Sequence, residues 1–269
     1  MPGHKLEKLQ MLQKTATYSS SSEEQEEGQH KATTTTPAFT NNGVLSGNVI
    51  RSRRSAHKFD SSAMLSKVDF LQMVQRLTQD NPASLPWNML LQQEQIVHRV
   101  TGMESGQYIL IRDLERMNHL QHHVFLASTK WTRVTESLYL IESMNVEVMA
   151  QKVSCDQEIA GESSFTIGAF ADLGHYGNGK NVDTGENRKE EGHRYRRMYW
   201  EAGIIGHLLY VDATSVGFGA TGIGCHEDEP MRMYFVRQNQ TTFTPLYHVA
   251  VGKPLIDKRI VNLPPYDRE

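Results

Sequence analysis

Cysteine and long apolar segments are both scarce in this chain. Only Cys155 and Cys225 occur among 269 residues, and neither belongs to a CxxC pair or to a set with metal-ligand spacing. A disulfide framework and a structural zinc site are therefore both unexpected, and two solitary cysteines are typical of a reducing compartment. No run approaches the roughly 18 apolar residues that a membrane-spanning helix requires. We therefore expect a cytoplasmic protein with no membrane partner.

The chain also lacks an excess of charge of one sign. It carries 28 lysines and arginines against 31 aspartates and glutamates, which gives a formal net charge of -3. This balance provides no basic field that would attract nucleic acid, so we expect no nucleic-acid partner. With 38% hydrophobic residues, the chain can bury one sizeable core.

Few apolar side chains occur in the first 48 residues. After Leu6, Leu9 and Leu12, the chain runs through clusters of serine, glutamate and threonine. Such a composition cannot bury enough apolar area to offset the entropy that is lost when the backbone becomes ordered. We therefore expect a disordered leader at 1–48 and one folded domain at 49–269. The leader is either a passive tail or a targeting segment, and its acidic cluster disfavours an ordinary transit peptide.

Hydrophobic periodicity predicts a mixture of helices and non-adjacent strands in the folded domain. Helices are expected at 62–79, 146–153 and 188–216, the last with the strongest pattern. Strands are expected in a hairpin over 95–113 and at 138–141, 164–171 and 245–251, with a glycine-rich loop over 174–187. This combination predicts an α+β fold with a mixed central sheet flanked by helices.

Two glycines, Gly203 and Gly206, lie inside the long helix predicted at 188–216. An interior glycine costs a helix about 1 kcal/mol relative to alanine. We therefore expect a compensating gain from the missing side chains, such as the close approach of another helix.

A basic segment, residues 51–60, opens the predicted domain and contains Arg53, Arg54 and Ser55. Guanidinium groups bind phosphate oxygens in a bidentate manner, and a serine hydroxyl adds a neutral donor. The segment therefore indicates a phosphate site. Lys258 and Arg259, which follow the last predicted strand, could close over the same phosphate. The alternative for both segments is an ordinary solvated surface.

Residues 217–224 are rich in glycine, and the first six match the dinucleotide fingerprint GxGxxG. That fingerprint functions only where a strand precedes it and a helix follows it. The predicted order is the reverse, because the helix at 188–216 runs into the glycines. The glycines could instead let backbone amides approach a flat ring, since residues without a Cβ permit such closeness. A plain helix cap and turn is the alternative.

Taken in chain order, these segments resemble the nitroreductase family over roughly residues 49 to 266. The likeness rests on four stretches: Arg53-Arg54-Ser55-Ala56-His57-Lys58-Phe59-Asp60, the helix sequence from Tyr195 to Tyr210, Thr221-Gly222-Ile223-Gly224, and Leu246 to Pro254 with Asp257-Lys258-Arg259. The resemblance implies a nitroreductase-like, FMN-binding α+β fold. It also implies an oxidoreductase that is alternately reduced by one substrate and oxidised by another.

The resemblance also implies where FMN would bind. It places the phosphate beside Arg53, Arg54, Ser55, Lys258 and Arg259, and the flavin ring beside Gly222, Ile223 and Gly224. Such enzymes commonly hold the flavin between two subunits, so a homodimer is expected. Tyr195 is a candidate proton donor and Cys155 a candidate pocket residue near the substrate, although both residue types equally suit structural positions. His119, His122 and His123 lack a carboxylate or thiolate at ligand spacing, so we expect a surface turn and no metal.

Three stretches resemble one branch of the family in particular, the branch with dehydrogenases that oxidise thiazoline or oxazoline rings in modified peptides. These stretches are 97–108, 154–157 and 262–266. Members often carry two such domains, and this chain resembles the C-terminal one, so pairing with a second such domain is expected as an alternative to a homodimer. The chain departs from free nitroreductases at Leu85, which precedes Pro86-Trp87 where they show asparagine or glutamine.

Three functions remain open from the sequence. The first is an active FMN-dependent oxidoreductase acting on a small molecule or a peptide. The second is a non-catalytic interaction or scaffold module of the same fold. The third, a nicotinamide dehydrogenase with a Rossmann fold, requires a strand immediately before Gly217.

Overall fold

The computed structural model describes residues 47–78, 91–112, 114, 117–121, 131–173, 185–227 and 243–263. The chain divides into a unit of residues 1–35 and a unit of residues 36–269, and every described residue belongs to the second unit. Residues 1–46 of the expected leader, most of the expected 174–187 loop, Leu85-Pro86-Trp87, His122 and His123 lie outside the described residues. The leader at 1–48 therefore stays a prediction.

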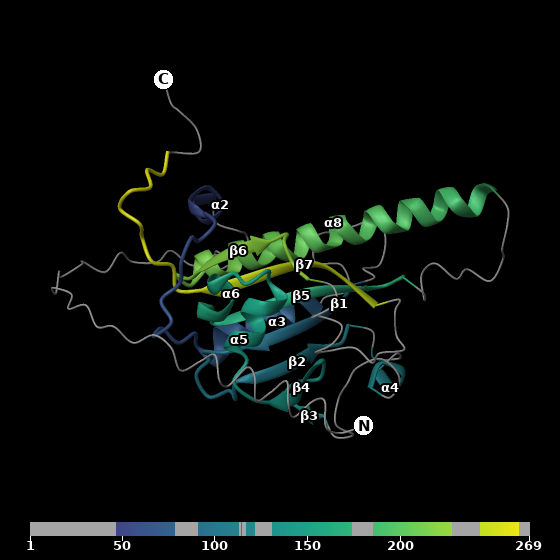
Figure 1. Ribbon diagram of the computed structural model, residues 1–269, viewed down its shortest axis with the longest axis horizontal. Coiled ribbons are helices and arrows are strands. Elements are labelled where there is room, and N and C mark those ends of the chain that lie inside the picture. Colours follow the sequence, from purple (N-terminus) through teal and green to yellow (C-terminus); the bar gives the residue numbers. More distant parts are fainter. Residues whose placement is uncertain are drawn as a thin grey trace. The chain divides into compact units, whose positions relative to one another are not determined.

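The described strands form one seven-stranded sheet in the order β3-β4-β2-β1-β5-β7-β6 (Figure 1). Their bounds are β1 (Gln92–Val97), β2 (Gly106–Leu110), β3 (Thr132–Arg133), β4 (Leu138–Ser143), β5 (Phe165–Asp172), β6 (Gly219–Ile223) and β7 (Phe243–Gly252). All six strand pairs are antiparallel, and the parallel contacts are isolated bridges made by Ser55 and Leu65. The expected α+β class is confirmed, and the sheet is mixed only through these bridges.

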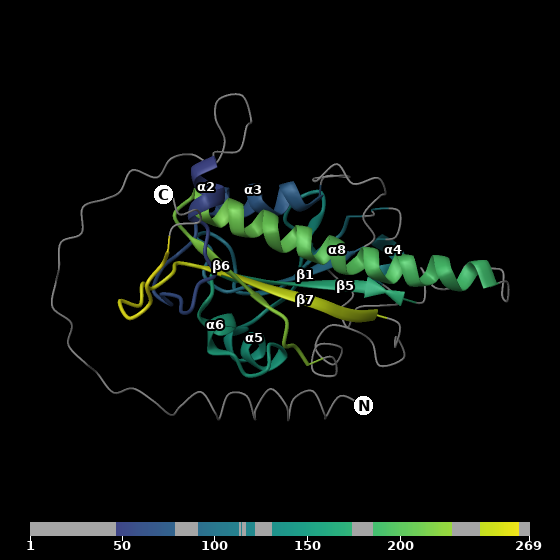
Figure 2. The same cartoon turned by 90° about the horizontal axis from the view of Figure 1, so that it is seen from above.

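Helices cover both faces of the sheet (Figure 2). The helices α2 (Gly47–Ser52), α3 (Lys67–Thr78) and α8 (Gly185–Ser215) lie on one face, and α5 (Glu147–Val153) and α6 (Glu158–Glu162) lie on the other. A single turn, α4 (Met117–His119), completes the described helices. The expected helices correspond to α3, α5 and α8, whereas α2 and α6 were missed because helices of five or six residues show no repeat of the helical period.

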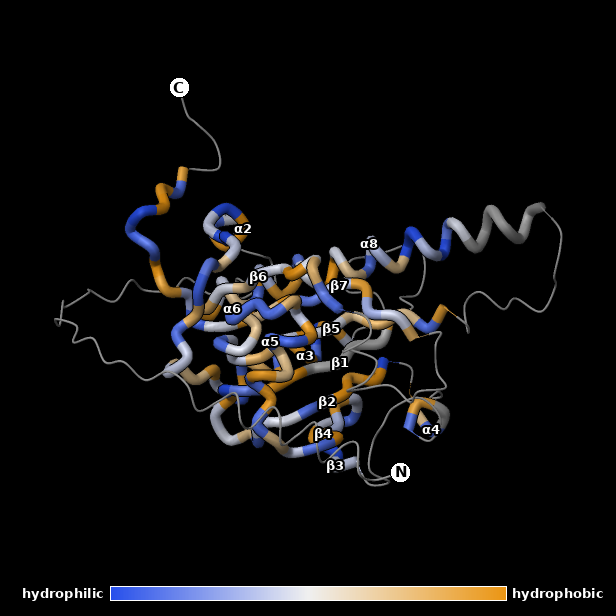
Figure 3. Tube along the Cα trace, viewed as in Figure 1, coloured by the Kyte–Doolittle hydropathy of each residue, from blue (hydrophilic) through white to orange (hydrophobic). Residues whose placement is uncertain are grey.

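Each face of the sheet carries its own hydrophobic core, because side chains alternate between the two faces of a strand. In β5, Phe165 and Ile167 join the core beneath α3 and α8, whereas Phe170 joins the core beneath α5 and α6. The strands accordingly carry much of the hydrophobic colour in Figure 3. All eight residues of β5 are buried, as expected for a central strand covered on both sides.

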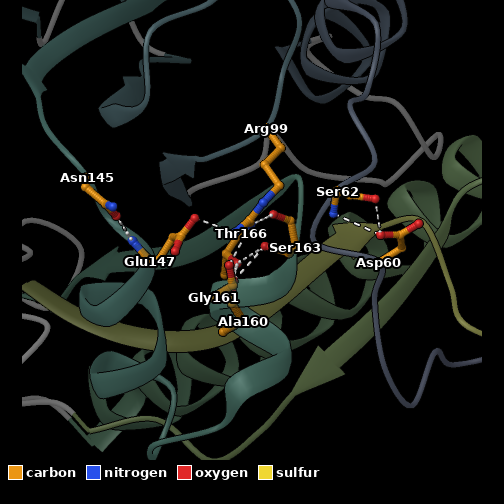
Figure 4. Close-up of polar contacts among 9 residues, drawn as sticks. All are labelled: Asp60, Ser62, Arg99, Asn145, Glu147, Ala160, Gly161, Ser163 and Thr166. Carbon is orange, nitrogen blue, oxygen red and sulfur yellow. Dashed lines mark hydrogen bonds and ion pairs between the residues drawn. The ribbon is translucent and has the colours of Figure 1, made fainter. Parts of the chain in front are cut away.

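Arg99, which follows β1, links this strand to α5 and α6 through hydrogen bonds and an ion pair. Its Nη1 donates to the carbonyl oxygens of Gly161 (2.7 Å) and Ser163 (2.9 Å), and its Nη2 forms an ion pair with Glu147 (Figure 4). The Gly161 and Ser163 carbonyls lie at the C-terminal end of α6. The last carbonyl groups of a helix have no hydrogen-bond partner within the helix. One partly buried guanidinium therefore bonds to the carbonyls at the end of α6 and links them to Glu147 at the start of α5.

The glycine-rich segment forms an edge strand that follows a helix. α8 ends at Ser215, Gly217 has a left-handed φ of 74°, and β6 begins at Gly219. A Rossmann site needs a strand directly before the glycines, and α8 stands there instead. The hypothesis of a Rossmann-type nicotinamide dehydrogenase is therefore excluded. The outer edge of β6 is paired with the basic segment: the Ala56 amide donates to the Ala220 carbonyl (3.0 Å), and Thr221 Oγ1 donates to the Ala56 carbonyl (2.8 Å).

Two glycines leave room for one tyrosine ring between α8 and the sheet. A Cβ on Gly206 of α8 would lie 3.0 Å from Tyr247 Cε1, and a Cβ on Gly222 of β6 would lie 1.8 Å from the Tyr247 hydroxyl. The partner that Gly206 accommodates is therefore a side chain of β7, not the second helix that we expected. Gly203 has no atom within 4 Å of its Cβ position and lies on the exposed side of α8.

No helix among the residues that the structure describes is long and apolar enough to span a membrane. Within the same residues, no group of three or more His, Cys, Asp or Glu side chains is arranged to hold a metal ion.

Two buried histidines make the stability of the domain depend on pH. Burial lowers the pKa of His98 and of His248 from 6.5 to about 3. Among the described residues, neither ring nitrogen of His98 has a hydrogen-bond partner, and His248 has only Ser154 Oγ, 3.2 Å from Nδ1. Between pH 6.5 and about 3, the unfolded chain therefore binds more protons than the folded chain.

We predict that the free energy of unfolding falls as the pH drops below about 6.5, by on the order of 1 kcal/mol per pH unit for each histidine. Urea titrations at several pH values measure this slope. His98→Leu should make it shallower, whereas His193→Gln, which removes an exposed histidine of α8, should leave it unchanged. A slope that is equally steep in the His98→Leu variant would contradict the prediction.

Candidate functional site

A cavity of about 200 Å³ lies where the beginning and the end of the described domain meet. Its walls combine polar donors with apolar side chains. The lining residues come from three segments: Ser52, Arg54, Ser55, Ala56 and His57; Thr214, Phe218 and Gly219; and Pro254, Leu255, Ile256, Asp257, Ile260 and Asn262. The structure therefore brings the basic segment and the C-terminal tail, residues 254–263, to one cavity. The cavity lies beside the end of α8 and the start of β6.

Arg54 connects the two ends of the domain at this cavity. Its Nη1 donates to the Arg51 and Arg53 carbonyl oxygens, both at 2.8 Å, and its Nη2 donates to the Leu263 carbonyl oxygen at 2.9 Å. A guanidinium carries five N–H donors, so these three bonds leave N–H groups for a ligand. Arg54 therefore both holds the tail and adds positive charge to the cavity wall.

The other predicted cations do not line the cavity. Arg53 donates to the Ile50 carbonyl within the α2 turn, and Lys258 is exposed. Arg259 donates two hydrogen bonds to the Asp257 carboxylate, from Nε to Oδ1 (3.0 Å) and from Nη2 to Oδ2 (2.7 Å). This contact holds the pKa of the Asp257 carboxyl below its usual value. Arg259 thus neutralises the one acidic side chain in the lining.

The three residues expected beside a flavin ring have different environments. The Gly222 amide donates to the Tyr210 hydroxyl at 2.8 Å, so this amide is already engaged. Ile223 pairs with His248 in the β6–β7 ladder, and its side chain is buried in the core beneath α5 and α6. Gly224 follows the strand, is exposed, and has open space around its Cβ position. Gly224 is therefore the most accessible of the three.

Tyr195 lies far from the cavity. It stands on α8 nineteen residues before the lining residue Thr214, which corresponds to about 28 Å along a helix axis. Its hydroxyl shares a hydrogen bond with Tyr199 (3.1 Å), and the ring is 47% exposed. Figure 1 shows the N-terminal end of α8 extending away from the sheet. Tyr195 therefore cannot reach a ligand in the cavity of its own chain.

The expectation of two solitary cysteines was wrong, because Cys155 and Cys225 form a disulfide. This pairing could not be predicted, since the cysteines are 70 residues apart in the sequence and only the fold brings their Cα atoms to 5.9 Å. The disulfide joins the turn between α5 and α6 to the segment after β6, where the Glu227 amide also donates to the Val153 carbonyl (3.2 Å). Cys155 is absent from the lining of the cavity.

Several residues of the site escaped prediction. His57, Thr214 and Asp257 line the cavity, and Tyr210 bonds to Ser55 and Gly222 behind it. His57 and Asp257 stood within segments already singled out, but nothing in the sequence distinguished them from their neighbours. Tyr210 and Thr214 lie at the end of α8, where helical periodicity predicts burial and gives no information about a partner.

We predict that the disulfide contributes to stability. Closing a loop of this length restricts the unfolded chain, so reduction or the double variant Cys155→Ser/Cys225→Ser should lower the free energy of unfolding by about 2–4 kcal/mol. Denaturant titration with and without reductant measures the loss, and reductant should not affect the double variant. Two titratable thiols in unfolded protein purified without reductant would contradict the prediction and would agree with the expected reducing compartment.

Comparison with known proteins gives structural matches only. No family model matches the chain, and no curated protein is similar to it in sequence. A protein of Anabaena variabilis ATCC 29413 assigned as a nitroreductase aligns with a TM-score of 0.57 at 16% identity, over 77% of this chain and 38% of that one. This chain thus spans well under half of that protein.

Two further structures match nearly the whole of this chain. A protein of Ralstonia eutropha JMP134, also assigned as a nitroreductase, aligns with a TM-score of 0.52 at 13% identity, over 86% of this chain and 89% of that one. A chain of the E. coli microcin synthetase McbBCD complex, with truncated pro-MccB17 bound, aligns with a TM-score of 0.51 at 13% identity, over 93% and 82%. These matches show that the chain has the nitroreductase fold.

Proposed function

We propose that this protein is an FMN-dependent oxidoreductase that binds the phosphate end of FMN in the cavity between the basic segment and the C-terminal tail. The main support for the proposal is that Arg54, Ser55 and the C-terminal tail line the same cavity in a chain with the nitroreductase fold. Bound FMN would supply the redox chemistry, by accepting and donating electrons or hydride.

The residues of the cavity suit a phosphate joined to a less polar group. Ser52, Ser55 and His57 can donate hydrogen bonds, and Arg54 adds charge, so an oxyanion would find both kinds of donor. Phe218, Leu255, Ile256 and Ile260 supply the apolar walls. Gly224 would leave its backbone open to a ring beyond the phosphate. These features fit the cofactor without any substrate being specified.

The Tyr195 of the same chain could not donate a proton to a ligand in the cavity, and Cys155 could not line a substrate pocket as a free thiol. Cys155 is bonded to Cys225, and Tyr195 stands about 28 Å from the cavity along α8. A second subunit or domain could present its own Tyr195 here. The substrate class that we favour is an organic molecule or a modified peptide, with azoline dehydrogenation as one option, because a chain of microcin synthetase shares the fold.

The test is the binding of FMN by the purified full chain. We expect yellow protein, quenching of FMN fluorescence on titration, and release of FMN on denaturation. Arg54→Glu should weaken binding at least about tenfold, because it places a like charge beside the phosphate. Arg133→Glu, the same change on the distant strand β3, should have no effect. Colourless protein that also takes up no added FMN would contradict the proposal.

A second candidate function is a non-catalytic interaction module with the same fold. The volume of about 200 Å³ favours it, since it lies below the roughly 300–1,000 Å³ of typical ligand pockets. The Gly222 amide also favours this function, because it already donates to Tyr210 and is not free to bind a flavin ring. Protein that folds normally, binds no FMN and still associates with a partner would identify this function.

We further propose that a second nitroreductase-like subunit completes the site, in a homodimer or with a separate domain of this fold. The exposed side of α8 carries Tyr199 (45% exposed), Trp200 (55% exposed) and the open Gly203. The tail adds Ile256, 88% exposed, and Val261, 80% exposed. Large apolar side chains grouped on one helix and one tail are typical of an interface. The much longer Anabaena variabilis protein is compatible with pairing to a second domain.

If the homodimer forms through α8, a bulky charge on its open glycine should separate the subunits. We predict that wild-type protein sediments as a dimer and that Gly203→Arg sediments as a monomer. Thr132→Arg, on strand β3 at the opposite edge of the sheet from β6, is the matched control and should remain dimeric. Sedimentation velocity measures all three. A wild-type monomer would exclude the homodimer and leave pairing with a separate domain.

The expected cytoplasmic localisation stays a prediction. It would require the Cys155–Cys225 pair either to resist the reducing pool or to exist there as two thiols.

A further inference from the structure

The Tyr210 hydroxyl connects two segments of the candidate site that are far apart in the sequence. It lies 2.8 Å from Ser55 Oγ, in the cavity wall, and 2.8 Å from the amide nitrogen of Gly222, on the edge of β6. Tyr210 itself is not part of the lining. Its side chain rises from α8, one turn before Thr214, so a rigid element fixes the hydroxyl behind Ser55.

The direction of the two hydrogen bonds made by the Tyr210 hydroxyl follows from which groups can donate and which can accept. A backbone N–H can only donate, so the Tyr210 oxygen accepts from Gly222. The phenol has one proton of its own, and among the described residues Ser55 Oγ is the acceptor within reach. When Tyr210 donates to Ser55, the Ser55 proton must point elsewhere. Since Ser55 lines the cavity, the cavity is the open direction.

Hydrogen bonds aligned in one direction strengthen each other, because each donor becomes more polarised when its own oxygen accepts a bond. The order Gly222 N–H, Tyr210 O–H, Ser55 O–H therefore ends in an improved donor at the cavity wall. Such a donor favours an oxyanion over a cation or a neutral donor.

The charges around the cavity agree with an anionic ligand. Arg54 contributes a guanidinium, and His57 lies close enough to Asp257 to help lower the pKa of its carboxyl. Asp257 is the acidic group of the lining, and both of its oxygens accept from Arg259. The carboxylate is thereby compensated, and the anion would meet a net positive wall.

We infer that Tyr210 is a positioning residue that turns the Ser55 hydroxyl toward the cavity, so that it donates to an oxyanion of the ligand. The inference rests on the proposed function, in which that oxyanion is the FMN phosphate. Tyr210 would touch neither the flavin ring nor a substrate. Its effect would be confined to the recognition of the phosphate.

The experiment compares FMN with riboflavin, which has the same ring and ribityl chain but no phosphate. Dissociation constants of both are measured by fluorescence quenching for the full chain and for Tyr210→Phe, Ser55→Ala and the double variant. We expect Tyr210→Phe and Ser55→Ala each to weaken FMN about tenfold and to leave riboflavin within about twofold. The double variant should lose little more than Ser55→Ala alone, because both changes remove one interaction.

Tyr247→Phe is the matched control. It removes another tyrosine hydroxyl that lies against Gly222, but the contacts of Ser55 do not include it. FMN affinity should be unchanged in this variant. Ser55→Thr retains a hydroxyl at the same position and should restore most of the affinity that Ser55→Ala loses.

The outcomes separate the inference from the proposed function. Wild-type protein that binds neither flavin contradicts the proposed function itself. Wild-type protein that binds FMN while Tyr210→Phe binds it equally well overturns the inference alone. An equal loss of FMN and riboflavin affinity in Tyr210→Phe also overturns it, because the role would then be a structural one on β6.

Tyr210→Phe leaves the Gly222 amide without its acceptor, so the variant is first checked by urea titration. If it does not fold, 3-fluorotyrosine at position 210 replaces it. Fluorination strengthens the phenol as a donor while keeping the ring in place. FMN should then bind more tightly relative to riboflavin, and an unchanged ratio overturns the inference.

Discussion

The pairing of residues 55 and 56 with the outer edge of β6 is the contact on which the rest of the site depends. An exposed strand edge presents unpaired N–H and C=O groups, and native folds cover them. Here Ala56 donates to Ala220, and Thr221 returns a bond to the Ala56 carbonyl. This short parallel contact fixes Ser55 beside the end of α8 and directs Arg54 toward the tail. Without it, Arg54 and Ser55 would lose their fixed position beside β6, while Lys58 and Asp60 would still bond to the segment that follows β7.

The same edge limits which backbone groups can bind a cofactor. Gly222 lies on β6, where its amide points away from β7, and Tyr210 accepts from it. Ile223 belongs to the ladder with β7. A ligand bound here would therefore meet a strand whose polar groups are mostly satisfied, and side chains from other segments would have to recognise its charged end. Gly222 has a packing role as well, because the absence of a side chain leaves space for Tyr247.

The secondary structure could be predicted from the sequence wherever one periodic pattern was long enough to decide it. α3, α8, the β1–β2 hairpin, β5 and β7 follow from apolar spacing, because burial on one face determines both the element and its orientation. The nitroreductase fold was recognised from four stretches in chain order, and the structural matches agree. The meeting of the two ends of the domain was likewise anticipated.

The side-chain detail of the site could not be predicted in the same way. Which arginine faces the cavity depends on a turn of α2 that positions Arg53 and Arg54 differently, and a run of arginines does not encode that choice. Arg259 pairs locally with Asp257, two residues away, where the sequence suggested a ligand. The disulfide depends on two turns that only the assembled sheet brings together. In each case a specific contact in three dimensions decides between alternatives that have the same sequence pattern.

The length of α8 imposes a final constraint on any reaction at the cavity. One end of this helix carries Thr214 at the cavity, and Tyr195 stands about 28 Å away along the helix axis. A rigid helix cannot fold back to bring the two together. If Tyr195 acted on a ligand in the cavity, it would therefore have to come from a second chain. Tyr199, Trp200 and the open Gly203 lie on the exposed side of α8, as a contact with such a second chain would require.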